Sequence, residues 1–187
     1  MAHAPTLTTA RTMQYTNRRG YLAGFLVCAG LIGFALYLQY VVGEDPCPLC
    51  LLQRIAFMGL GVVFLGAALH NPRGTAAAVY GVLLLPFAAA GAAIAGRHVW
   101  LQSLPKNMVP ECGPGLDYIL SRFPLQKAID MVLRGSGECA EKGWTFLGLS
   151  IAGWSLVWFV LLAMLAVVVT VRATRERDGA RHAQLRA

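Results

Sequence analysis

The residues of this sequence best suited to chemistry are two cysteines with a proline and a leucine between them. Cys47-Pro48-Leu49-Cys50 directly precedes an apolar run. Because proline suits the first position of a helix, we predict that a helix begins at Pro48 and that both thiols lie in its first turn. Residues three apart share a helical face, and the free N–H groups of that turn stabilise a thiolate. The motif therefore predicts thiol-disulfide exchange, with a disulfide that acts as an oxidant.

Arg54 follows Cys50 by one helical turn and lies on the same predicted face. An arginine in a membrane-spanning helix is costly, at about 2.5–3.5 kcal/mol near the midplane, so one near the boundary needs an explanation. We interpret Arg54 as a cation that stabilises a thiolate and an anionic, reduced acceptor beside Cys50. The alternative is a side chain that extends to lipid headgroups. We expect the neighbouring Gln53 to be an exposed amide at the membrane interface.

Cys112 and Cys139 form a second pair within a long polar connection. Gly113-Pro114-Gly115 follows the first, and glycines precede the second. In an oxidising compartment the two are expected to be bonded, either as a mobile, exchanging disulfide or as a structural staple. Zinc held by four cysteines is disfavoured, because it would need two Cys-x-x-Cys knuckles, and we predict no metal. The remaining cysteine, Cys28, is expected to be a packed, inert thiol.

The elements that must position these cysteines are four apolar runs. The chain has 187 residues, of which 57% are hydrophobic and 13% charged, too few polar side chains to cover a water-soluble globule. A bilayer core of about 30 Å needs about 20 apolar residues as a helix, which satisfies its own backbone hydrogen bonds. We therefore predict an all-α integral membrane protein, a four-helix bundle with helices over about 21–42, 51–69, 76–95 and 146–171.

The placement of charge predicts the orientation of these helices. The net charge of +7 comes largely from arginines before the first run, between the second and third, and after the fourth. This distribution follows the positive-inside rule, so no nucleic-acid partner is needed to explain it. Both tails, residues 1–17 and 175–187, are expected to be cytoplasmic and disordered. The short loop 43–50 and the long loop 97–145 then lie on the outer side of a single membrane domain, residues 1–187.

The long outer loop carries a predicted element of its own. From Leu125 to Arg134, apolar residues recur at helical spacing, which predicts a short amphipathic helix that lies in the interface or packs on the bundle. Glycines then lead into Cys139, which we expect to be mobile. Trp100 and Trp144 bracket the loop, and tryptophan at such places is typical of interfacial anchors.

These motifs, in this order, resemble the bacterial disulfide bond formation protein B (DsbB) family. The resemblance covers about Tyr21 to Val171. It rests on Cys47-Pro48-Leu49-Cys50 with Gln53-Arg54, on Gly96-Arg97-His98-Val99-Trp100-Leu101-Gln102, and on Gly137-Glu138-Cys139-Ala140 with Trp144 and Leu147-Gly148-Leu149. It implies a protein-disulfide oxidoreductase of the bacterial inner membrane, with both loops in the periplasm. Its partner would be a periplasmic DsbA-type thioredoxin-fold oxidase, which the family reoxidises while passing electrons to membrane quinone.

The resemblance also implies a role for each of the four outer cysteines. The partner thiolate would attack Cys112, where a transient mixed disulfide forms. Freed Cys139 would then exchange with Cys47, and Cys50 would become the thiolate beside the acceptor. These four cysteines are the predicted catalytic residues.

The predicted cofactor of the resembled family is a quinone, either ubiquinone or menaquinone. Cys50, Arg54 and His98 are the positions that the resemblance places beside it, with Arg54 as the polarising cation. Vitamin K epoxide reductase also couples a membrane Cys-x-x-Cys motif to a quinone, but the loop motifs favour the DsbB family. A structural or transport protein with two inert disulfides is the remaining alternative.

Overall fold

Four long helices dominate the structure, a computed structural model that describes residues 7–105, 108, 122, 124, 126–127 and 137–184, with backbone alone at 7–16 and 176–184. They are α1 (Leu7–Tyr37), α2 (Pro48–His70), α3 (Thr75–Ser103) and α7 (Ile151–Gln184). Each contains a stretch that is long and apolar enough to cross a membrane, with a mean hydropathy between 1.9 and 2.5. The predicted four-helix membrane fold is confirmed.

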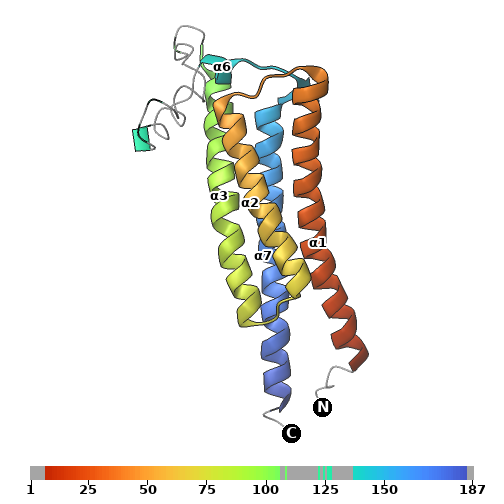
Figure 1. The fold of residues 1–187 in the computed structure, drawn as a ribbon. Helices are drawn as coiled ribbons and strands as arrows, with labels where there is room; N and C mark the ends of the chain where they lie inside the picture. Colours follow the sequence, from red (N-terminus) through yellow and green to blue (C-terminus); the bar gives the residue numbers. More distant parts are fainter. Residues whose placement is uncertain are drawn as a thin grey trace.

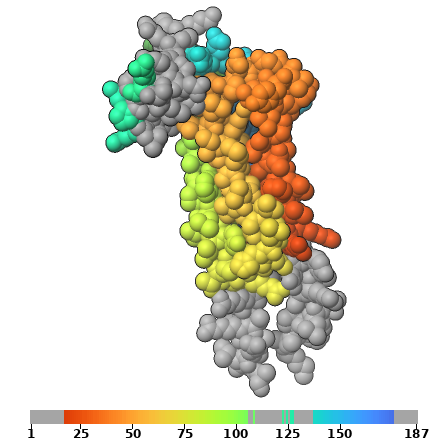
Figure 2. All heavy atoms as spheres, in the orientation of Figure 1, coloured from red at the N-terminus to blue at the C-terminus, as the bar shows by residue number. Residues whose placement is uncertain are grey.

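The four helices form an elongated bundle in which each packs mainly on two others. α1 packs on α2, α2 on α3, α3 on α7, and α7 on α1. Figure 1 shows α1 beginning and α7 ending at one end of the bundle, where the connection from α2 to α3 also lies. Figure 2 shows α1, α2 and α3 side by side along one face. The opposite end, where α2 begins and α3 ends, carries the cysteine motif and is called the thiol end below.

The third helix is longer than predicted. α3 continues to Ser103 instead of ending near residue 95, because its buried face continues through His98 and Leu101. Residues that the sequence assigns to the beginning of the long loop therefore lie on the last turns of a helix. Among them, His98 points from α3 toward the start of α2.

The fourth helix begins later than predicted, at Ile151 rather than near residue 146. Before it, β1 (Thr145–Phe146) and β2 (Leu149–Ser150) form an antiparallel hairpin. The register pairs Thr145 with Ser150 and Phe146 with Leu149. Leu147 and Gly148 form the turn with positive φ angles of 50° and 79°, which matches the twist of a two-residue hairpin. This reversal delays the start of α7.

The terminal tails are helical over much of their length. α1 begins at Leu7 and α7 continues to Gln184, so the prediction of disordered tails is wrong for residues 7–17 and 175–184. A long membrane helix already supplies the costly nucleus, and each further residue adds a hydrogen bond at little cost. Both tails also contain good helix formers such as alanine, arginine and glutamine.

Apolar side chains fill the bundle from its middle toward the end that carries the termini. Phe57 of α2 stacks on Phe159 of α7, with ring centroids 3.9 Å apart. Helices approach closely where one of them presents a glycine. A Cβ added at Gly91 would lie 2.1 Å from the Phe159 ring, and one added at Gly59 would lie 2.5 Å from Phe87. Small residues thus permit the close contacts typical of membrane helices.

Cys28 lies within this apolar core. Its side chain is 1% exposed, and its Cβ faces Gly61 of α2. The prediction of a packed thiol in the first helix is therefore confirmed.

Short elements surround the start of α2 at the thiol end. The π-helix η1 (Leu38–Val42) continues α1 and ends at Gly43, whose φ of 84° turns the chain toward the cysteine motif. The short helix α6 (Gly137–Ala140) contacts α3, as Figure 1 shows. The predicted amphipathic helix from Leu125 to Arg134 lies outside the described residues, apart from 126–127.

Candidate thiol-disulfide site

The Cys47-Cys50 motif forms the first turn of α2. Cys47 is the N-cap residue, with an extended backbone, and Pro48 is the first helical residue, as predicted. The Cys50 backbone N–H donates to Cys47 Sγ at 3.4 Å, and the two sulfur atoms lie 3.1 Å apart. Both sulfurs therefore lie where the unpaired N–H groups of a helix start favour a thiolate.

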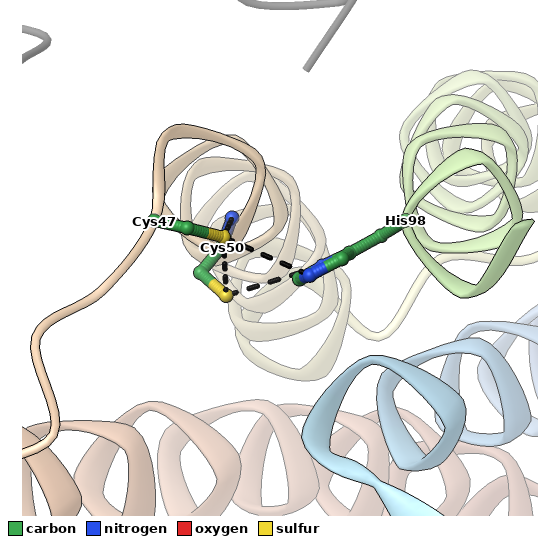
Figure 3. A group of neighbouring side chains, drawn as sticks. All are labelled: Cys47, Cys50 and His98. Atoms are coloured by element: carbon green, nitrogen blue, oxygen red, sulfur yellow. Dashed lines mark hydrogen bonds between the residues drawn. The ribbon is translucent and has the colours of Figure 1, made fainter. Parts of the chain in front are cut away.

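His98 reaches this pair from α3. Its Nε2 atom lies 3.7 Å from Cys47 Sγ, and its Nδ1 atom lies 4.0 Å from Cys50 Sγ. Figure 3 shows the ring pointing across from α3 toward both sulfurs. The side chain is only 3% exposed. An imidazole in this position can accept or release a proton next to either thiol.

Gln53 holds the His98 ring from the α2 side. Its Nε2 atom lies 3.1 Å from His98 Nδ1, and the side chain is 3% exposed. The prediction of an exposed amide at the interface is wrong, because Gln53 turns toward α3. There the imidazole supplies the partner that a buried amide requires.

Gln102 connects the same ring to two other elements. It lies one turn beyond His98 on α3, with its Nε2 atom 3.5 Å from His98 Nε2. The amide also donates to the Glu141 carbonyl at 3.4 Å, and its Oε1 atom accepts a hydrogen bond from the Ser150 hydroxyl. Sequence reasoning assigned no role to Gln102, although its helical spacing from His98 was a signal that could have found it.

Cys139 lies in α6, and its side chain is fully buried. It packs into one apolar cluster with Cys47, Leu49 and Leu101. The glycines before it predict a mobile thiol, whereas the described side chain is enclosed, because two leucines cover a sulfur that has little need of water. The structure thus brings Cys139 to the α2 pair. Its predicted partner, Cys112, lies outside the described residues.

Arg54 is half-buried and is held against the end of α1. Its guanidinium donates to Gln39 Oε1 in η1 and, at 3.0 Å, to the Ala35 carbonyl. These acceptors explain how a cation is accommodated within a membrane-spanning stretch. Gln39 was not predicted, since nothing in the local sequence indicates that a π-helix directs it toward α2.

A cavity of about 880 Å³ opens beside the thiols and is partly lined by Cys50, Arg54 and His98. Its size lies in the range of small-molecule sites, about 300–1,000 Å³. Its aromatic lining residues are Phe34, Phe57, Trp144, Phe146, Trp154 and Trp158. The acidic residues in its lining are Glu44, Asp45, Glu138 and Glu141. The cavity thus joins a broad apolar surface to a few convergent polar groups.

The two tryptophans that bracket the long loop have different surroundings. Trp144 packs edge-on against Phe34 and stacks on Phe146, in the cavity wall. Trp100 is 48% exposed, and the Arg97 guanidinium lies 4.2 Å from its ring centroid. Trp144 therefore contributes to the site, whereas Trp100 faces outward from α3.

Comparison with known proteins gives one consistent match. A family model described as Disulfide bond formation protein DsbB matches residues 17–169. Disulfide bond formation protein B of Hahella chejuensis is 54% identical over 160 residues, which cover 86% of this chain and 97% of the relative. The protein of that name from Marinobacter nauticus is 53% identical over 154 residues, covering 82% and 92%. That from Methylobacillus flagellatus is 50% identical over 155 residues, covering 83% and 93%. With its paired thiols and four membrane-spanning helices, this chain belongs to the DsbB family of disulfide bond formation proteins, as a multi-pass membrane thiol oxidoreductase.

Proposed function

We propose that this protein reoxidises a periplasmic, DsbA-like thioredoxin-fold protein and passes the electrons to membrane quinone. The observation that carries the proposal is the shared cavity, which is lined by Cys50, His98 and Arg54 together with six aromatic side chains. These lining residues suit a quinone. Its flat ring can pack on the aromatic side chains, and its carbonyl oxygens can accept hydrogen bonds from the arginine and the imidazole. A lipid-soluble acceptor also explains why reactive thiols lie at the end of membrane-spanning helices.

The electrons enter through the outer loop. A partner thiolate attacks a Cys112–Cys139 disulfide at Cys112, so that a mixed disulfide forms and the Cys139 thiolate leaves. Freed Cys139 then attacks Cys47, so that the Cys50 thiolate leaves, and the burial of Cys139 against Cys47 supports this exchange. The second partner thiol displaces Cys112, which releases the partner as a disulfide, and Cys112 then reforms its bond to Cys139 and frees Cys47. Two electrons and two protons thereby pass from the partner to the α2 pair.

The acceptor side of the site uses residues from two helices, α2 and α3. Bound quinone supplies a sink for two electrons and two protons. The helix start stabilises Cys50 as a thiolate facing the cavity, and Arg54 adds a fixed positive charge there. His98, within 4.0 Å of Cys50 Sγ, can hold the proton that leaves this thiol. Gln53 keeps the ring in place.

The charges at the two ends of the bundle support a location in the bacterial inner membrane. Arg18 and Arg19 lie at the start of the first apolar stretch, Arg73 between α2 and α3, and Arg172 near the end of the last. These residues belong to the end that carries the termini, which we assign to the cytoplasm by the positive-inside rule. The thiol end, with its acidic cavity lining, then faces the periplasm.

The decisive experiment follows quinone reduction by the purified chain in lipid, with a reduced DsbA-like protein as electron donor. Cys50→Ser should reduce the rate to background, because the thiol that faces the cavity is gone. Cys28→Ala, which removes a core thiol, is the matched control and should retain the wild-type rate. Equal rates for Cys50→Ser and the wild type would rule out the mechanism and favour the structural or transport alternative.

The role of Arg54 has its own test. Arg54→His should raise the quinone concentration needed for half-maximal rate without abolishing the reaction, because the cation is weakened while the thiols remain. An unchanged quinone dependence would leave Arg54 only a structural role, in its hydrogen bonds to Gln39 and the Ala35 carbonyl.

A further inference from the structure

Three metal-binding donor atoms converge at the start of α2. Sγ of Cys47, Sγ of Cys50 and a ring nitrogen of His98 lie within 4.8 Å of one another. Cysteine and histidine are the preferred ligands of Zn²⁺ and similar cations, and three protein ligands leave a fourth position open. We propose that Cys47, Cys50 and His98 bind a thiophilic divalent cation of the Zn²⁺ type, and only while both cysteines are reduced.

The distances between the donor atoms suit a tetrahedral ion. With metal–sulfur bonds of about 2.3 Å and a metal–nitrogen bond of about 2.0 Å, neighbouring ligand atoms lie about 3.5–3.8 Å apart. His98 Nε2 lies 3.7 Å from Cys47 Sγ, and the two sulfurs lie 3.1 Å apart. The ion therefore fits after the sulfurs separate by a fraction of an ångström, which a small side-chain rotation provides.

Gln53 suits the outer shell of this site. It occupies the Nδ1 side of the ring at 3.1 Å, so Nε2, which lies 3.7 Å from Cys47 Sγ and at the longer distance of 3.5 Å from Gln102 Nε2, is the nitrogen to face an ion beside Cys47. A metal-bound histidine usually donates its other N–H to a fixed acceptor, which sets the tautomer and the ring orientation. A half-turn of the buried Gln53 amide directs its oxygen to Nδ1–H and provides that acceptor.

The cavity lining favours the entry of a cation. Four acidic residues contribute to it from two separate segments, Glu44 and Asp45 before α2 and Glu138 and Glu141 around α6. Among the described lining residues, Arg54 is the only lysine or arginine, and its charge is directed to Gln39 and Ala35. Clefts lined by one sign of charge raise the local concentration of the opposite ion.

Binding requires no redox partner. Each thiol releases one proton as its sulfur coordinates, so one cation replaces two protons and no electron is transferred. A Cys47–Cys50 disulfide offers no thiolate and cannot bind. The bound ion in turn prevents the two sulfurs from forming a disulfide, so the site is inhibitory for thiol oxidation. This inference goes beyond the proposed electron transfer and does not depend on a quinone.

The test is equilibrium dialysis of the full chain in detergent against Zn²⁺, before and after oxidation of Cys47 and Cys50. The reduced protein should bind one equivalent that the oxidised protein does not bind, and Zn²⁺ should protect both thiols from alkylation. Loss of an outer-shell partner typically weakens a metal site by about 10–100-fold. Cys50→Ser and His98→Ala remove direct ligands, so each should weaken Zn²⁺ binding by at least about 100-fold.

Matched controls separate this site from other thiols and imidazoles. Cys28→Ala and His70→Ala remove the same residue types elsewhere and should leave Zn²⁺ affinity unchanged. A double variant, Cys112→Ser with Cys139→Ser, should also bind one equivalent of Zn²⁺ when reduced. Equal Zn²⁺ binding by reduced and oxidised wild-type protein would overturn the proposal without any substitution. Loss of binding in the double variant would assign the ion to the loop cysteines instead and would equally overturn it.

Discussion

At Gly91, α3 lies so close to α7 that an added methyl group would overlap the Phe159 ring. About two turns further along α3, at His98, the helices enclose a cavity of about 880 Å³. The closed region places a glycine opposite an aromatic ring. The open region places polar side chains opposite one another and adds η1, α6 and the hairpin around them.

A membrane bundle can hold a hollow, reactive site when a neighbouring region of the same helices is densely packed. The closed region provides dense apolar contact and fixes the spacing of the helices. The open region loses such contact, and hydrogen bonds among Gln53, His98 and Gln102 replace it. Substitutions should therefore affect stability in the closed region and reactivity in the open one.

The largest expected effect is a loss of stability caused by overpacking the closed region. Gly91→Ala places a Cβ 2.1 Å from the Phe159 ring, and that ring is fully buried and stacked on Phe57. Overpacking of this kind costs about 1–3 kcal/mol, and we expect a value at the upper end. Thermal unfolding in detergent measures it. Gly30→Ala, where nothing lies within 4 Å of the added Cβ, is the control. Equal unfolding temperatures for the two variants would contradict the prediction that the close packing at Gly91 determines stability.

The next prediction concerns reactivity in the open region. His98→Ala should lower quinone reduction by about 10–100-fold, because it removes the only imidazole near the thiols among the described residues. His70→Ala removes an imidazole that contacts Tyr80 and should keep the wild-type rate. A wild-type rate for His98→Ala would exclude proton transfer by this ring.

A smaller effect concerns the link between the two thiol pairs. Gln102→Ala removes hydrogen bonds to Glu141 and Ser150, each worth about 1 kcal/mol, so exchange between the loop and α2 thiols should slow by about 5- to 30-fold. Single-turnover trapping of the mixed disulfide measures this step, while quinone reduction by a pre-reduced α2 pair should change less, because Gln53 still holds the His98 ring. Ser103→Ala, whose hydroxyl donates to the Trp100 carbonyl of its own helix, is the control. Equal slowing of both steps would place Gln102 at the acceptor side instead.

The parts of the site predicted from sequence are those fixed by local rules. Pro48 defines the helix start through its own geometry, so the positions of both α2 thiols followed from it. The packing of Cys28 and the close helix contacts at glycines could be predicted from the apolar setting of a membrane helix. In each case the residue and its neighbours in the chain contain the information.

The parts that sequence reasoning missed depend on contacts between distant segments. Gln53 is buried because His98 meets it from another helix, and Cys139 is enclosed because Leu49 and Leu101 converge on it. The hairpin before α7 requires a positive φ at Leu147, which a leucine gives no reason to expect. Such features become visible only when the helices are assembled.

The smallest expected effect concerns the position of the Arg54 charge. Gln39→Leu removes one of the two acceptors of the guanidinium and leaves the Ala35 carbonyl in place. The charge should then shift within the cavity without being lost, so the quinone concentration for half-maximal rate should rise about two- to threefold, less than the roughly fivefold equivalent of one hydrogen bond. The maximal rate should stay constant, because no thiol is altered. Tyr40→Phe, at an exposed neighbour in η1, is the control. A fall in maximal rate with an unchanged quinone dependence would show that Gln39 acts through the packing of η1 rather than through Arg54.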